Sequence, residues 1–305
     1  MINIETKLKF RKHIWNNYSD GQFEYCASHI SYSFELNGKE LEMTIGISTE
    51  RQEEISTIFI EIVDFLFLAC GTMPVIVYYK EDDVCKDVSK LPCRYFPSEQ
   101  FYCSHHLIDI NDSTLNETTL KSIKDTIRSK PFGLFHAFTA LTSKGYENIY
   151  SEHKITLLLH CFEGYIYNKG TKYQSYTFKE SIKEIINTLF QYDKNYDIEI
   201  LKTLSTNENE YLNILKDTRH QFSHYICKSK SLNTGQDYLI NFVLLHYIFR
   251  IYLLKEINIV PKEDNIKEFL YSVYDWINSL KDNNFKNYKS VVYSTFNSIK
   301  TIFNI

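Results

Sequence analysis

The fold class is decided by residues 30–45, which read ISYSFELNGKELEMTI. Apolar side chains alternate with polar ones in residues 30–36 and again in residues 41–45. A period of two is typical of a strand with one buried face. Asn37 and Gly38 separate the two segments, and both residue types tolerate the positive φ of a tight turn. The sequence therefore predicts an antiparallel β-hairpin near the start of the chain.

The hairpin belongs to a region that mixes helix and strand. Residues 51–70 carry apolar side chains at the spacing of a helix face, and Gly71 is suited to end that helix. Residues 75–79 and 101–110 are predicted strands, separated by a polar loop over residues 81–100. The first third of the chain is therefore predicted to be a mixed α/β domain.

The periodicity becomes helical from about Asn116 and stays so. We predict helices at residues 117–129, 152–168, 177–191, 207–227, 236–258, 262–281 and 286–303. The helix at 236–258 is apolar on nearly all sides, which places it inside a bundle or at a dimer interface. The predicted fold class is α+β, with a mixed sensing or regulatory domain over residues 1–129 and an all-α bundle over residues 130–305.

The composition is that of a folded protein, and its charge is mildly acidic. The 305 residues are 44% hydrophobic and 24% charged, and 34 basic against 38 acidic residues give a net charge of −4. A protein that binds nucleic acid constitutively is usually basic overall. If RNA is the substrate, a local patch must hold it, after activation or dimerisation.

The sequence favours a cytoplasmic protein without a membrane segment. The amino terminus lacks the apolar core of a signal peptide. The apolar stretch at 55–70 is too short to span a bilayer and contains Glu61 and Asp64. Seven scattered cysteines do not form the pattern of a disulfide framework.

The candidate site is the stretch 219–224, Arg-His-Gln-Phe-Ser-His, near the end of a predicted helix. Arginine is a permanent cation that can hold a phosphate, and histidine can move a proton near neutral pH. His220 and His224 are four residues apart and share a helix face, whereas Arg219 and His224 are about 140° apart. At a loosened helix end all three side chains can converge on one ligand group.

The surroundings of this motif resemble the HEPN superfamily, and within it the ApeA-like HEPN domains. The resemblance is carried by residues 215–225, by the later Leu-Leu-rich helix end at 252–256, and by residues 152–163, where Glu163 matches a family glutamate. It covers roughly residues 130–260. His220 departs from the pattern, because Asn is commoner at that position in ApeA-like relatives, although other HEPN ribonucleases carry His there.

The resemblance implies a metal-independent endoribonuclease that works as a homodimer, with two motifs facing each other across the interface. His224 would act as general base or acid, and Arg219 would stabilise the charge that grows on the phosphoryl oxygens. His220 would orient the phosphate or His224. The implied setting is bacterial anti-phage defence or abortive infection, started by a phage-derived or nucleotide trigger. No cofactor is expected.

Other interpretations of the same residues stay open. His220 and His224 have a spacing that can bind zinc, but a third ligand at a telling spacing is missing. Cys85, Cys93 and Cys103, with two nearby histidines, lack the close pairs of zinc motifs, so no metal is expected. As a second function, the domain would be a non-catalytic HEPN module that senses a nucleotide or RNA; a third possibility is a purely structural helical protein.

Overall fold

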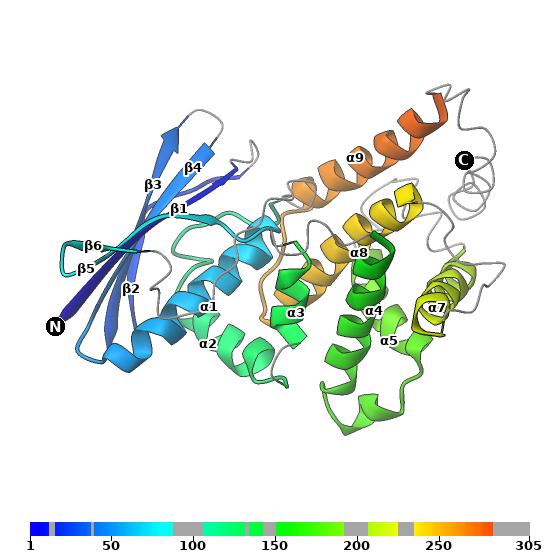
Figure 1. Cartoon of the computed structure of the whole chain (residues 1–305), viewed down its shortest axis with the longest axis horizontal. Coiled ribbons are helices and arrows are strands. Elements are labelled where there is room, and N and C mark those ends of the chain that lie inside the picture. Colours follow the sequence, from blue (N-terminus) through cyan, green and yellow to red (C-terminus); the bar gives the residue numbers. More distant parts are fainter. Residues whose placement is uncertain are drawn as a thin grey trace. The chain divides into compact units, whose positions relative to one another are not determined.

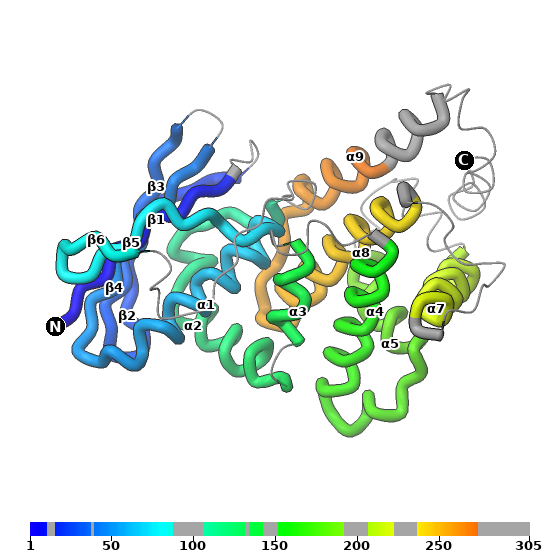
Figure 2. Tube along the Cα trace, in the orientation of Figure 1, coloured from blue at the N-terminus to red at the C-terminus, as the bar shows by residue number. Residues whose placement is uncertain are grey.

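The computed structural model describes residues 1–11, 16–37, 40–87, 106–131, 134–142, 151–191, 207–224 and 235–282, which are coloured in Figure 1; Figure 2 shows the same chain as a tube along the Cα trace. The chain divides into two compact units. The first contains Met1–Phe132, Thr142–Glu147 and Leu253–Asn265, and the second contains the remaining segments. The molecule is α+β, with an antiparallel sheet followed by helices (Figure 1).

The first unit is built on a six-stranded antiparallel sheet with strand order β2-β3-β4-β1-β5-β6. Its strands are β1 (Ile2–Arg11), β2 (Gly21–Tyr25), β3 (Ser28–Asn37), β4 (Glu40–Thr49), β5 (Val75–Glu81) and β6 (Val84–Lys86). Alternate residues of β1 and β4 are buried, among them Leu8 and its cross-strand partner Met43. One face of the sheet therefore belongs to the core, as the alternation predicts.

The predicted hairpin is confirmed as β3 and β4. Asn37 still belongs to the ladder and pairs with Glu40, so the turn lies one residue later than the Asn-Gly pair suggests. Gly38 and Lys39, which connect the strands, lie outside the described residues.

Helix α1 (Gln52–Cys70) packs against β4, and also against α2 (Glu117–Ser122) and the π-helix η3 (Ile123–Arg128). Gly71 ends α1 in the left-handed region at φ 85° and donates its N–H to the carbonyl of Phe67, which satisfies a helix-end acceptor. Within this packing α1 buries the carboxylate of Asp64, whose partner is Arg128 at 2.6 Å.

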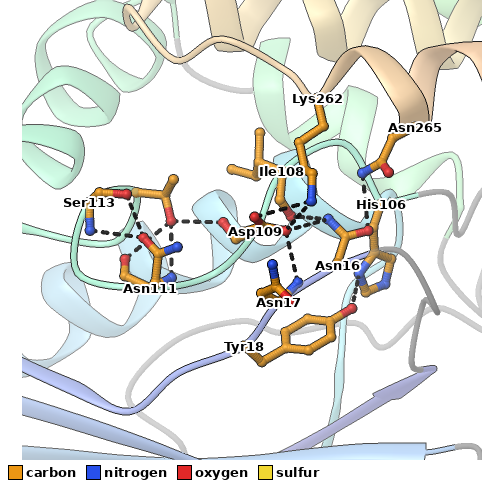
Figure 3. A network of polar contacts seen from close by, with 11 residues as sticks. Asn16, Asn17, Tyr18, His106, Ile108, Asp109, Asn111, Ser113, Lys262 and Asn265 are labelled. Atoms are coloured by element: carbon orange, nitrogen blue, oxygen red, sulfur yellow. Dashed lines mark hydrogen bonds and ion pairs between the residues drawn. The ribbon is translucent and has the colours of Figure 1, made fainter.

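A polar network holds the segment around residue 262 within the first unit (Figure 3). The ammonium of Lys262 lies 3.0 Å from a carboxylate oxygen of Asp109. The buried amide of Asn16 donates to the carbonyl of Ile108 at 2.6 Å and accepts from Asn265 at 3.0 Å. Buried amides need such partners, so the network fixes where the segment after α8 enters α9.

The second unit is helical. It contains α3 (Leu134–Ala140), α4 (Ser151–Tyr167), the short 3₁₀ helix η5 (Thr171–Ser175), α5 (Phe178–Phe190), α7 (Glu208–His224), most of α8 (Gly235–Glu256), and α9 (Glu263–Asp282) from Ile266 onward. Between Asp237 and Leu254 every residue of α8 except Leu239 is buried. Helix α8 is therefore an interior helix of one chain. Of the two positions that its composition predicts, inside a bundle or at a dimer interface, the structure shows the first.

The stretch Asp237–Glu256 is long and apolar enough to cross a membrane by length and composition, yet 94% of its apolar window is buried inside the protein. The core helix of a folded domain passes the same test.

Most predicted elements match the structure, with three differences. The predicted helix 117–129 is formed as α2 followed by η3, whose π-helical turn continues the chain to Arg128. Over its described part, 106–110, the predicted strand 101–110 makes only an isolated bridge between Ile110 and Tyr18. Strands β1, β2 and β6 and the short helices α3 and η5 were not predicted, and β6 lies in the segment 81–100 that was predicted as a polar loop. The predicted helix at 286–303 lies outside the described residues.

Asp64 gives the fold a testable pH dependence. Burial raises the pKa of Asp64 to about 7, against the opposing effect of Arg128. In the unfolded chain this carboxyl ionises near pH 4. Between these two pH values only the folded state keeps the proton on Asp64. The stabilisation that this proton gives the folded state is therefore present at low pH and is lost as the pH rises towards 7.

In the wild type, ionisation of Asp64 should lower the free energy of unfolding by about 1–3 kcal/mol between pH 5 and pH 8. We expect the Asp64→Asn variant to lack this part of the pH dependence. Urea titrations of the wild type and the variant at both pH values measure it. Equal pH dependence in the two proteins would show that Asp64 ionises normally.

Candidate functional site

The candidate site is organised by an ion pair between α7 and α4. The Nη2 atom of Arg219 donates to Oε2 of Glu163 at 2.7 Å. The side chains of Arg219 and Glu163 are 22% and 33% exposed, so the pair lies at the rim of the helical unit and is reachable from solvent. Because α4 and α7 pack together, each helix fixes one partner of the pair.

A third helix supports the same guanidinium. The centre of the Arg219 guanidinium lies 5.1 Å from the ring centroid of Phe178, the first residue of α5. Thr177 and Glu180 form a reciprocal capping box around Phe178, which fixes the start of α5. The Nε atom of Arg219 is buried and has no hydrogen-bond partner among the described residues. The cation is thus held on two sides, by a carboxylate and by an aromatic face.

His160 is a site residue that no motif in the sequence marks. It lies one helical turn before Glu163 on α4 and is exposed. Partial burial lowers the pKa of His160, the charge of Arg219 lowers it further, and Glu163 opposes both. The lowered pKa favours the neutral imidazole, the form that can accept a proton. Its spacing of three residues to Glu163 is the signal that could have identified it.

The structure places Arg219, His220 and His224 on one helix, α7. Helix α7 is regular through His224, so the predicted loosening of its end is not seen at this position. Arg219 faces α4 and α5, and in a regular helix His224 is about 140° away from it. The side chain of His220 is half-buried, and that of His224 lies outside the described residues.

Phe222 fixes the end of α7 from within the motif. Its ring centroid lies 5.9 Å from that of His153 on α4 and 5.6 Å from that of Tyr238 on α8. These contacts hold the last turn of α7, and with it the backbone of the motif, between two helices.

No metal site is found within the described ranges, where no three His, Cys, Asp or Glu side chains lie close enough together to hold an ion. Cys85 is exposed on β6, and His106 is buried with its Nδ1 atom 2.7 Å from the Tyr18 hydroxyl. Cys93, Cys103 and His105 lie outside the described residues, as do Lys228 and Lys230, the lysines that follow the motif. Lys216, which precedes it, is exposed on α7.

The pair Arg219–Glu163 predicts a measurable coupling. Both groups are partly exposed, so solvent screens the attraction, and we expect a coupling energy of about 0.5–1 kcal/mol. A double-mutant cycle with Arg219→Ala, Glu163→Ala and the double variant measures it by urea unfolding. Additive effects of the two single variants would contradict the ion pair.

Comparison with known proteins identifies the region that carries this site. Residues 162–264 match the family model described as Apea-like HEPN. The match begins at the turn of α4 that carries Glu163, includes Phe178 and the whole of α7, and ends at the start of α9. No curated protein and no solved structure matches the chain. Residues 162–264 are thus similar to ApeA-like HEPN domains, a similarity that suggests a ribonuclease or another RNA-related function in defence.

Proposed function

We propose that the chain is a metal-independent endoribonuclease, a triggered cytoplasmic effector of anti-phage defence whose site contains Arg219, His220 and His224. The observation that carries the proposal is the fixed guanidinium of Arg219, which Glu163 and Phe178 hold in place. Arg219 lies on α7, the helix that also carries both histidines of the motif. HEPN domains are often ribonucleases, and this helix lies within the family match.

The residues support cleavage by attack of the ribose 2′-hydroxyl. In the proposed reaction His224 takes the hydroxyl proton, and the 2′-oxygen forms a bond to phosphorus. The bond from phosphorus to the 5′-oxygen breaks, and that oxygen takes the proton back from protonated His224 and leaves as a 5′-hydroxyl. Arg219 stabilises the negative charge on the phosphoryl oxygens, and His220 orients the phosphate. The products are a 2′,3′-cyclic phosphate and a 5′-OH end, so DNA is not a substrate.

The positions of Arg219 and His224 around the axis of α7 support a shared site in a dimer. Arg219 turns towards α4 and α5 of its own chain, while His224 is about 140° around the helix. HEPN domains commonly dimerise and bind RNA. In the proposed homodimer, two motifs face each other, and one phosphate contacts side chains of both chains. Since α8 is buried within one chain, other surfaces supply the dimer contact.

Two substitutions test the chemistry. In EDTA, we expect Arg219→Ala and His224→Ala each to slow cleavage of labelled RNA by at least about 100-fold, because each removes a transition-state group. Lys216→Ala, an exposed position on the same helix, is the matched control and should cut normally. Circular dichroism checks the fold, and end-group analysis checks for the cyclic phosphate.

Loss of wild-type cleavage in EDTA would refute the metal-free reaction. RNA or nucleotide binding that needs Arg219, without cleavage, would support the non-catalytic sensor instead. If both variants fail to fold, the motif has a structural role.

A mixing experiment tests whether two chains share one site. Arg219→Ala and His224→Ala are each expected to be inactive alone, but about half of the randomly paired dimers in an equal mixture combine one intact copy of each group. We expect the mixture, after unfolding and refolding together, to regain RNA cleavage. A mixture as inactive as its components, with dimers confirmed by light scattering, would place a complete site in each chain.

A further inference from the structure

The loop between α4 and α5 has an unusual composition for this chain. Counted from the last turn of α4 to the first turn of α5, residues 164–179, the segment called the loop below contains three lysines, four tyrosines and no acidic residue, although the whole protein has a net charge of −4. Tyr167 is 51% exposed, and Tyr173 and Tyr176 are partly exposed. By contrast Tyr165, Tyr211, Tyr238, Tyr247 and Tyr252 of the same unit are buried. The loop is thus a local basic and aromatic surface.

This loop is joined at both ends to the residues that hold Arg219. Tyr167 lies one helical turn beyond Glu163 on the same face of α4, about 6 Å along the axis. Tyr176 lies two residues before Phe178, so their Cα atoms are at most about 7 Å apart. Glu163 and Phe178 both contact the guanidinium of Arg219. If Arg219 binds one phosphate of a nucleotide chain, the neighbouring bases of that chain would therefore lie against the loop.

The loop is held in place before any ligand binds. The ammonium of Lys169 donates to the hydroxyl of Tyr252 on α8 at 2.9 Å and lies 3.7 Å from Glu184 on α5. The amide of Asn168 donates to the carbonyl of Gly164 at 2.7 Å. Lys169 therefore anchors the loop, and a fixed loop binds with a smaller loss of conformational entropy.

The outward groups of the loop suit a single strand. The rings of Tyr173 and Tyr176 pack edge to face with centroids 5.1 Å apart, and the ammonium of Lys172 lies 5.4 Å from the centroid of Tyr173. Bases of a single strand stack on such rings, whereas duplex bases are already stacked on each other. Lys172, beside the ring of Tyr173, is placed to meet a phosphate.

We propose that Tyr167, Lys172, Tyr173 and Tyr176 form a platform that binds single-stranded RNA next to Arg219. This inference rests on the RNA function proposed above and names the surface that holds the substrate. A local surface of this kind would let a protein with a net charge of −4 bind RNA, because this segment itself has no acidic residue.

The test measures binding of a fluorescent single-stranded RNA of about 12 nucleotides to the His224→Ala protein, which leaves the RNA uncut. Tyr167→Leu and Tyr176→Leu keep an apolar side chain and remove the ring. We expect each to raise Kd about tenfold. Tyr271→Leu, at a tyrosine 47% exposed on α9, is the matched control and should leave Kd unchanged.

Salt dependence tests the charge separately. Lys172→Gln should reduce the slope of log Kd against log salt by about 0.7, the value for one phosphate contact of a single strand. Lys121→Gln, an exposed position on α2, should leave the slope unchanged. Duplex RNA of the same sequence should compete poorly with the single strand.

The outcomes separate this inference from the proposed catalysis. Cleavage by the wild type, together with Tyr167→Leu and Tyr176→Leu proteins that bind RNA normally, would overturn the platform alone. Loop-dependent binding without cleavage would support the platform and remove the catalytic proposal. Absence of RNA binding in the His224→Ala protein would overturn the platform. The cleavage assay of the wild type would then decide the catalytic proposal separately.

Discussion

The candidate site depends on one interaction, the ion pair between Arg219 on α7 and Glu163 on α4. A free arginine side chain samples many rotamers, and holding it in one place costs conformational entropy. Glu163, at 2.7 Å, and the ring of Phe178 meet this cost in the folded chain, before a ligand arrives. A phosphate would find the cation already oriented, which is the arrangement that favours electrostatic stabilisation of a transition state.

Two of the three helices around this cation, α4 and α7, contact α8, which is buried on nearly all sides. Helix α8 also carries polar groups into the core, and each needs a partner there. The hydroxyl of Tyr211 on α7 donates to Asn241 on α8 at 2.9 Å, and the amide of Asn241 donates to the carbonyl of Asp237. These directional contacts set how α7 lies against α8, which a purely apolar interface would fix less strictly.

The fold was predictable wherever one local pattern determined one element. The alternation around Asn37 and the helical spacing after Asn116 report burial directly, so β3, β4 and the main helices could be found. Strand β1 was missed although Ile4, Thr6, Leu8 and Phe10 do alternate, because Thr6 interrupts the apolar series. The short helix α3 has too few turns for periodicity to identify it. The π-helical turn η3 depends on tertiary packing, which the helix propensities of single residues do not describe.

The site was predictable only along the single helix that carries its motif. The series Arg219, His220 and His224 is contiguous, so spacing and family resemblance both identify it. Phe178 and His160 lie on other helices, 41 and 59 positions before Arg219 in the sequence. Packing of the helices brings them near Arg219, and no local sequence pattern encodes that proximity. Glu163 could be suspected only through the resemblance. A chemical motif in one segment therefore identified the candidate site, while the residues around the Arg219 guanidinium could be placed only from the three-dimensional arrangement of α4, α5 and α7.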